Sequence, residues 1–555
     1  MRIGITLLLA TFLIPTTAQA KGPSEGEHGM VVSAHPAASE AGLNVLKASG
    51  NAVDAAVATA FAIAVVEPYG SGLGGGGFAV LWKDQTPSSL DFREKAPSAS
   101  HRDMFLTEGK VDPDKSRTGP FAVGVPGMVQ GLWELHQKHG SIPWPDLLAP
   151  AIRLAEDGFL VNAVLSEHIQ KNLERFNPPA RAIFCPKGTP LPIGSRLVQA
   201  DLAQTLRTLA KDGAVAFYKG EIAKRIAGSV QDAGGLLTLE DMEKYHTRWR
   251  DPVKGTYRGT RIFSMPPPSS GGIHLMQMLG ILENYDLKKW GYQSANSVHL
   301  LAEVMKFAFA DRSQWLGDPD FFDVPRERLL SKAHLDEIQG RIQMDSAIPS
   351  SEIEGAPTPP EGADTTHLSV IDRHGNAVSS TLTINLSFGS AMVAKGTGIV
   401  LNDEMDDFAA APGAPNAFGL LGSEANAVAP GKRPLSSMTP TIVTQNGKVL
   451  IVAGSPGGSR IITTTLQVIL HLLDFDMNVR QAVSLPRVHH QWYPKDLSIE
   501  PYGMSPDTLR ILEERGHSLS MSKFMGNAQV IFVDPKTNIR YGSSDPRGVG
   551  AARGY

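Results

Sequence analysis

Residues 21 to about 360 alternate between helical and extended patterns of apolar side chains. The segment 37–64 is rich in Ala, Leu and Val at helical spacing and is broken at Gly50, so it predicts two consecutive helices. Other short apolar runs predict buried strands, and amphipathic segments predict helices with one buried face. The predicted strands are 77–82 and 261–265, and the predicted helices are 147–155, 202–209 and 298–309.

The composition changes from about residue 346 to residue 364. This stretch is rich in Pro, Ser and Glu and has no hydrophobic periodicity. Such stretches are typical of flexible linkers, where proteolysis concentrates. We therefore expect a flexible connection here between two parts of one chain.

After this linker the pattern becomes that of strands. Residues 365–372 and 377–385 alternate on either side of a polar turn, which predicts a β-hairpin. A second predicted hairpin joins 439–444 to 448–453, and a glycine-rich break then precedes a predicted helix over 460–473. No internal repeat is visible in the sequence.

The first residues have the pattern of a secretory signal peptide. Arg2 is followed by an apolar run over 3–14 and by an A-x-A sequence that ends at Ala20. The alternative is a membrane anchor, but the run is shorter than the roughly 20 residues needed to cross a bilayer. We expect residues 1–20 to be removed and the mature protein to be periplasmic or secreted, with no membrane span.

Charge and cysteine content exclude several classes of function. The chain has 555 residues, with 52 Lys and Arg against 56 Asp and Glu, and this acidic balance argues against a nucleic-acid partner. Its hydrophobic content of 42% argues against a disordered chain. A single cysteine, Cys185, leaves neither an intramolecular disulfide nor a Cys-based zinc cluster to consider.

Thr365 lies where the linker meets the first predicted strand. If the peptide bond before it were cut, this threonine would carry a hydroxyl nucleophile and a free α-amine, whose pKa of about 8 suits a general base at neutral pH. Threonine with its own amine is a known activated nucleophile. Two threonines at the start of a strand are more often simple β-formers, so spacing alone favours the structural interpretation.

Residues 365–389, TTHLSVIDRHGNAVSSTLTINLSFG, match a family signature along their whole length. The chain resembles the γ-glutamyltranspeptidase family, also called glutathione hydrolases, of the bacterial periplasmic type. Further motifs in the same order carry the likeness along nearly the whole mature chain. They are 50–58, 72–78, 91–97, 266–274, 310–321, 401–408, 432–441, 454–461 and 544–547.

The resemblance implies a fold and a maturation step. The fold is that of N-terminal nucleophile hydrolases, an α+β four-layer αββα sandwich formed jointly by two autoprocessed subunits. The precursor would cut itself between Asp364 and Thr365 into a large subunit, 21–364, and a small subunit, 365–555, which stay together as a heterodimer. The resemblance implies no cofactor and no metal.

Three residues resemble those that hold the substrate α-carboxylate in the family. They are Arg93, whose guanidinium fork matches a carboxylate bidentately, and the serines Ser436 and Ser437. Taken alone, Arg93 would more simply form a surface ion pair with Asp91 or Glu94, and the serines would be loop hydroxyls.

Asn385, Glu404 and Asp407 match the family residues that receive the substrate α-ammonium group. A cation needs an anionic pocket rich in hydrogen-bond acceptors, and these side chains provide one. The alternative is a solvated acidic loop, which the surrounding sequence LNDEMDDFAAAPG also fits.

Other residues match the family's catalytic apparatus. Gly457 and Gly458 resemble the oxyanion hole, because glycines let successive N–H groups point at one anion beside a helix N-terminus; the alternative is a plain strand-to-helix turn. Thr383 resembles the threonine that hydrogen-bonds the nucleophile. Phe418 lies in a segment that resembles the lid loop, where bacterial members usually carry tyrosine.

The resemblance implies γ-glutamyl transfer. Thr365 would attack the γ-amide carbonyl of glutathione or a related compound, and water, an amino acid or a peptide would then release the glutamyl group. A glutaryl-cephalosporin acylase of the same fold is a second hypothesis, but glutaryl lacks the ammonium group that Glu404 and Asp407 would bind. A periplasmic binding protein is a third, and it would not need Thr365 at a linker boundary.

Overall fold

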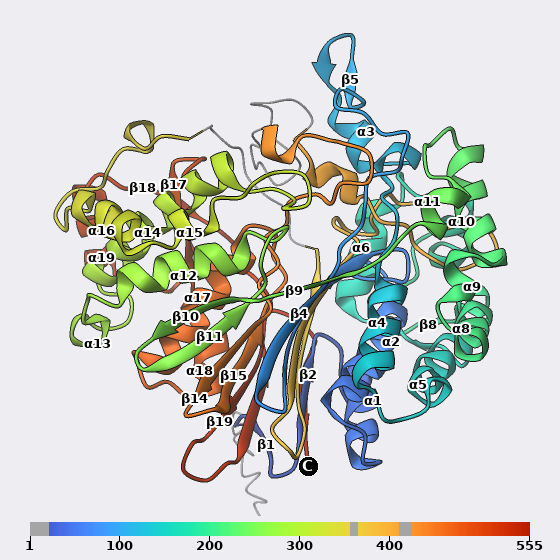
Figure 1. Cartoon of the computed structure of the whole chain (residues 1–555), viewed down its shortest axis with the longest axis horizontal. Helices are drawn as coiled ribbons and strands as arrows, with labels where there is room; N and C mark the ends of the chain where they lie inside the picture. The colour runs from blue at the N-terminus through green and yellow to red at the C-terminus, as the bar shows by residue number, and fades with distance from the viewer. Residues whose placement is uncertain (1–21, 356–363, 410–423) are drawn as a thin grey trace, which may run out of the picture.

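Two antiparallel sheets of seven strands each lie face to face at the centre of the molecule, with helices on both outer faces (Figure 1). The structure is a computed structural model that describes residues 22–355, 364–409 and 424–555. The layers therefore follow the order helix, sheet, sheet, helix, as the resemblance implies.

The first sheet contains the hairpin that begins next to Thr365. Its central strands β12 and β13 pair in register, with Thr366 opposite Leu382 and Ile371 opposite Ala377. The order across the sheet is β21 (Ala551–Gly554), β2 (Met30–Ser33), β12 (Thr366–Ile371), β13 (Ala377–Thr383), β3 (Gly76–Lys83), β4 (Thr86–Phe92) and β9 (Arg248–Arg250).

The second sheet contains the second predicted hairpin, β14 and β15. Its order is β1 (Ser24–Gly26), β20 (Arg540–Ser544), β19 (Gln529–Val533), β15 (Lys448–Gly454), β14 (Thr441–Gln445), β11 (Thr260–Ser264) and β10 (Val253–Tyr257). Each sheet thus takes strands from both sides of Thr365, so neither part of the chain forms a complete sheet alone.

Apolar side chains from the facing surfaces of the two sheets form a core between them. Phe78 and Trp82 of β3 and Phe263 of β11 are buried there, and the rings of Trp82 and Phe263 lie 5.3 Å apart. Burial of such large side chains stabilises each by about 1.5–3 kcal/mol. This core fixes the position of one sheet on the other, and with it the relative position of their ends.

The first sheet is covered by helices that precede Thr365. The two helices predicted over 37–64 are α1 (Pro36–Lys47) and α2 (Ala52–Val66), and Asn51 starts α2 with a capping box. Every residue of α2 is buried, because the helix is apolar on all sides and packs between the sheet and further helices. Those helices are α4 (Met128–His139) and α5 (Trp144–Glu156), and α8 (Ala200–Asp212) packs in turn on α5.

The second sheet is covered by helices from both parts of the chain. They are α12 (Gly271–Leu282), α14 (Ala295–Trp315), α17 (Arg460–Leu473) and α18 (Val479–Ser484). The predicted strands 77–82 and 261–265, the helices predicted over 147–155, 202–209 and 298–309 and both hairpins are all present, with boundaries that differ by a few residues. The helix over 298–309 is not amphipathic in its burial, because every residue from Ser297 to Ala310 of α14 is buried.

Shorter elements complete the described chain. The additional strands are β5 (Leu106–Thr107), β6 (Lys110–Val111), β7 (Phe159–Leu160), β8 (Arg196–Leu197), β16 (Val488–His489), β17 (Asp496–Ile499) and β18 (Ser518–Met521). The additional α-helices are α3 (Pro113–Arg117), α6 (Ala163–Asn172), α7 (Pro178–Phe184), α9 (Val215–Tyr218), α10 (Glu221–Asp232), α11 (Leu239–Glu243), α13 (Leu287–Trp290), α15 (Arg326–Leu329), α16 (Lys332–Arg341) and α19 (Pro506–Glu514).

The first part of the expected linker is packed against the protein. The side chain and carbonyl of Ser350 bond to Trp492, at 2.7 and 2.8 Å, and Ile353 is buried in the core beside the second sheet. Residues 346–355 are therefore not the free linker that their composition predicts, because their few apolar and hydroxyl side chains find partners. Residues 356–363 lie outside the described residues.

No helix among residues 22–355, 364–409 and 424–555 is long and apolar enough to cross a membrane. The expected signal peptide, 1–20, lies outside this part of the chain.

Candidate active site

A pocket forms at the end of the two sheets where β12 begins. Thr365 precedes β12 and Thr383 ends β13, while Arg93 follows β4 directly. From the second sheet come the loop before β14 and the turn after β15. The pocket is lined by Arg93, Arg312, Thr365, Thr383, Asn385, Glu404, Asp407, Ser436, Ser437, Met438, Gly458, Ser459 and Ile461.

The hydroxyl of Thr365 lies between two hydrogen-bond partners. Its Oγ1 donates to the carbonyl oxygen of Asp364 at 2.7 Å and lies 3.2 Å from Oγ1 of Thr383. Because the only proton of the Thr365 hydroxyl is used in the first bond, Thr383 is the donor in the second. Thr383 in turn accepts the backbone N–H of Asn385 at 2.8 Å. This chain of bonds fixes the Thr365 oxygen beside the peptide group that precedes it.

Arg93 is buried and bonded to two carboxylates of the pocket. Its two terminal nitrogens pair with Glu404 and Asp407, and its Nε donates to the carbonyl of Pro434 at 3.3 Å. The alternative partner Glu94 lies farther away, at 3.8 Å. The surface ion pair that the local sequence favours is therefore absent, since the guanidinium is only 1% exposed.

The acidic side chains around Arg93 have raised pKa values. Burial raises the pKa of Glu404 to about 7, against the opposing effect of Arg93, and it also raises the pKa of Asp407. Burial raises the pKa of Glu94 well above its usual range, with the charge of Glu404 adding to the effect. The protonated form of Glu94 is thus favoured, while Glu404 changes its charge near neutral pH.

Ser436 and Ser437 are held in place by two other motifs. The backbone of Ser436 bonds to the 266–272 turn, donating to the Pro268 carbonyl at 2.8 Å and accepting from the Ser270 N–H at 2.8 Å. The hydroxyl of Ser437 accepts from Arg312 at 3.2 Å. Arg312 lies in the family motif 310–321, but no local pattern singles it out from the rest of helix α14.

Gly457 and Gly458 turn the chain from β15 into helix α17. Their φ angles, 134° and 57°, lie in the region that favours glycine. Neither N–H bonds to another described residue, so both are free to meet an anion. Only Gly458 lines the pocket; a Cβ on Gly457 would lie 3.3 Å from the Cα of Gly526.

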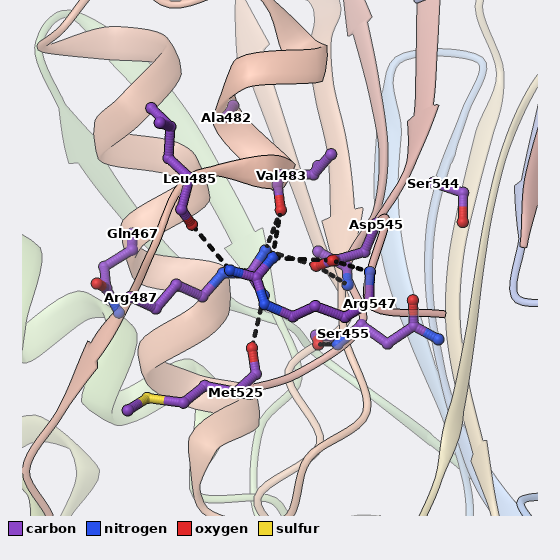
Figure 2. A network of polar contacts seen from close by, with 12 residues as sticks. Ser455, Gln467, Ala482, Val483, Leu485, Arg487, Met525, Ser544, Asp545 and Arg547 are labelled. Carbon is purple, nitrogen blue, oxygen red and sulfur yellow. Dashed lines mark hydrogen bonds and ion pairs between the residues drawn. The ribbon is translucent and has the colours of Figure 1, made fainter. Parts of the chain in front are cut away.

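A network of polar contacts around Arg487, Asp545 and Arg547 extends toward Ser455, at the start of this turn (Figure 2). Arg487 donates to the Met525 carbonyl at 2.5 Å and to Asp545 at 2.6 Å, and Arg547 bonds to the other oxygen of Asp545 at 2.9 Å. The segment after Met525 then reaches the turn, where the N–H of Asn527 donates to Ser455 Oγ at 2.9 Å. The family motif at 544–547 is therefore connected to the glycine turn by hydrogen bonds that pass through Arg487 and residues 525–527.

Polar groups surround the peptide bond before Thr365 as well. His168 lies 3.6 Å from the Asp364 carboxylate, stacks on Tyr69 with ring centres 4.3 Å apart, and bonds through Nδ1 to Ser387 Oγ at 2.7 Å. Burial raises the pKa of Asp364, and His168 opposes this shift. The sequence offered no signal for His168 or Tyr69, because both lie far from the hairpin along the chain.

The structure brings most of the expected site residues together. Nine of them line the one pocket, and Gly457 directly precedes the lining residue Gly458. The side chain of Asn385 donates to the Asp403 carbonyl at 3.1 Å, and its oxygen bonds to no other described residue. The lid residue Phe418 lies outside the described residues.

Comparison with known proteins identifies the chain. The family model described as Gamma-glutamyltranspeptidase matches residues 38–555. The chain belongs to this family. It is 48% identical over 533 residues to a glutathione hydrolase proenzyme from Escherichia coli strain K12, covering 95% of this chain and 92% of that protein. The chain is therefore an enzyme with γ-glutamyl transferase and hydrolase activity.

Solved structures agree with the fold. A cephalosporin acylase from Bacillus halodurans matches with a TM-score of 0.85 and 29% identity, covering 99% of both chains. A γ-glutamyltranspeptidase from Helicobacter pylori matches with a TM-score of 0.57 and 43% identity, over 58% of this chain and 94% of that chain. The fold is thus that of N-terminal nucleophile hydrolases. The relative from Escherichia coli is a proenzyme, and the solved chain from Helicobacter pylori spans little more than half of this one. Both observations indicate a precursor processed into two subunits.

Proposed function

We propose that the chain is exported through residues 1–20, cuts itself between Asp364 and Thr365, and then uses Thr365 to transfer γ-glutamyl groups from glutathione or related amides. The observation that carries this proposal is the position of the Thr365 hydroxyl. It lies 2.7 Å from the carbonyl oxygen of Asp364 and lines the same pocket as Arg93 and Glu404. This position supports a role for one hydroxyl in both reactions.

In the cleavage step, Thr365 Oγ attacks the carbonyl carbon of Asp364 and the C–N bond of that peptide breaks. The acyl group moves from nitrogen to oxygen, which leaves an ester on Thr365 and a free α-amine. Water then hydrolyses the ester, giving a carboxylate on Asp364 and restoring the hydroxyl. Thr383, which donates to the Thr365 oxygen at 3.2 Å, supports this step by fixing the direction of attack.

In the transfer step, Thr365 Oγ attacks the γ-carbonyl of the donor and its α-amine takes the hydroxyl proton. The N–H groups of Gly457 and Gly458 stabilise the oxyanion, and the amine of the leaving half departs with the proton. The γ-glutamyl ester on Thr365 then passes to water, an amino acid or a peptide.

The donor's α-amino acid group is recognised by exchange of ion pairs. Arg93 already pairs with Glu404 and Asp407 across the pocket. An α-carboxylate can take the place of these acids at Arg93, assisted by Ser436 and Ser437, while an α-ammonium binds the released carboxylates and Asn385. A glutaryl group would free the acids without supplying a cation, which disfavours the acylase alternative.

The test is the intact mass and N-terminal sequence of the protein purified from the exported fraction. We expect two chains, of which the smaller begins Thr365-Thr366-His367 and the larger lacks residues 1–20. The same preparation should release amine from a γ-glutamyl anilide much faster than from the matching glutaryl anilide. A single folded chain that reaches Tyr555, or a preference for the glutaryl compound, would contradict the proposal.

Binding of the donor is expected to weaken below pH 7. As the pH falls through about 7, Glu404 becomes protonated and no longer attracts an ammonium group. KM for a γ-glutamyl anilide should therefore rise as the pH is lowered from 8 to 5.5. In Glu404→Gln, KM should be about 10- to 100-fold higher at pH 8, as for the loss of a hydrogen bond to a charged group, and nearly independent of pH.

The control is the glutaryl anilide, which lacks the ammonium group. Its KM should change little between pH 8 and 5.5 and little in Glu404→Gln. Equal pH dependence for the two donors would show that Glu404 does not bind the ammonium.

A further inference from the structure

A second polar pocket lies at the opposite end of the two sheets. It is formed by the turns β3–β4, β12–β13 and β14–β15 together with the start of β20, and we call it the turn pocket. Strand β12 spans six residues from the active site to this end, so at about 3.4 Å per residue the turn pocket lies roughly 20 Å from Thr365. Figure 1 marks the C-terminus at the same end.

Arg540 is the buried cation of the turn pocket, with only 2% of its surface exposed. Its terminal nitrogens donate to backbone carbonyls alone: those of Glu27 and Asn538 at one nitrogen, and those of Asp372 and Arg373 at the other. Its Nε bonds to no other described residue. A buried charge without a carboxylate partner is costly, so this guanidinium is suited to an anion from outside.

The nearest carboxylate does not serve Arg540 as a direct partner. Both oxygens of Asp372 already accept N–H groups, from Ala52, His374 and Asn376, at 2.8 to 3.1 Å. Among the described residues, no carboxylate lies within ion-pair distance of Arg540. Asp372 therefore stabilises the turn and leaves the positive charge of the arginine only partly balanced.

Two more permanent cations line the turn pocket. Arg373 and Lys448 are exposed, and neither forms an ion pair within the described chain; Arg373 bonds only to the hydroxyl of Tyr555, at 3.3 Å. The single acidic side chain of the lining, Asp84, pairs with Lys83 at 2.8 Å. Three permanent cations thus share a cavity of about 370 Å³ with one carboxylate that is already paired.

We propose that the turn pocket binds a small multivalent oxyanion of the phosphate or sulfate type. The Nε–H of Arg540 is the donor that its carbonyl partners leave over, the planar guanidinium of Arg373 matches the oxygens of such an anion, and Lys448 adds a mobile charge. The cavity has room for the anion and several waters, each of which occupies about 30 Å³. All three cations follow the proposed cleavage site, so the small subunit holds the anion, far from the active site.

The probe is inorganic phosphate, added to the purified mature protein at constant ionic strength with chloride as the balancing salt. A ligand that binds only the folded protein raises Tm with its concentration. We expect a saturable rise in Tm, with half-saturation at low millimolar phosphate or below. In Arg373→Ala/Lys448→Ala, half-saturation should shift at least tenfold higher, while γ-glutamyl hydrolysis in chloride stays unchanged.

The matched control is Lys110→Ala/Lys187→Ala, which also removes two exposed cations, neither of which lines the turn pocket. It should keep the wild-type response to phosphate. A rise in Tm that does not saturate, or one that is equal in all three proteins, would overturn the proposal, because general salt effects act on the whole surface. Phosphate that competes with the γ-glutamyl donor and still stabilises the Arg373→Ala/Lys448→Ala protein would place the anion at Arg93, and would overturn it as well.

Discussion

Thr365→Ala is expected to remain one uncut chain and to lose γ-glutamyl transfer by a factor of roughly 10⁴ or more, because it removes the nucleophile of both reactions. The neighbouring hydroxyl of Thr383 does not replace this nucleophile, because its oxygen lies 3.2 Å from that of Thr365 and accepts the N–H of Asn385. The measurements are the pattern of chains under denaturing conditions and the rate of anilide release.

Thr365→Ser is the matched control. Serine keeps the hydroxyl and, after cleavage, the α-amine, so this variant should still give two chains and a substantial part of the activity. Thr365→Ala should also have the same far-UV circular dichroism as the wild-type precursor, because the pocket is formed before the cut. A Thr365→Ala protein that is cleaved normally at the same bond would refute the assignment of the nucleophile.

Arg93→Lys is expected to lower kcat/KM for a γ-glutamyl anilide by about 100-fold. Lysine keeps the positive charge but cannot make the planar two-point contact with a carboxylate. Lysine is chosen because alanine would leave buried Glu404 and Asp407 without a cation, a loss of about 3–5 kcal/mol of stability. Self-cleavage should remain complete, since Arg93 makes no contact with the Asp364–Thr365 bond.

A donor without the α-carboxylate separates binding from folding effects. The wild-type protein should strongly prefer the γ-glutamyl anilide to the 4-aminobutanoyl anilide, which lacks that group, and Arg93→Lys should lose most of this preference. If both donors lose activity equally in Arg93→Lys, the residue acts on the shape of the pocket and not on the carboxylate.

Local sequence determined the elements that depend on nearest neighbours. The helical spacing of 37–64 and the alternation on either side of residues 373–376 gave α1, α2 and the β12–β13 hairpin, because spacing and turn residues act over a few positions. They did not show that α2, β12 and β13 are buried at every position. The family motifs likewise named the residues of the pocket, because they preserve the residue types that the chemistry needs.

Tertiary structure decided which of these residues touch. Arg93 and Glu404 are 311 positions apart, and only the tertiary fold brings them into one buried pair. Packing also fixed residues 346–355 against Trp492, placed Arg312 at Ser437, and left Arg540 without a carboxylate partner at the far end of the sheets. Sequence patterns report which side chains are buried, whereas the partner of a buried charge depends on contacts between segments that no local pattern contains.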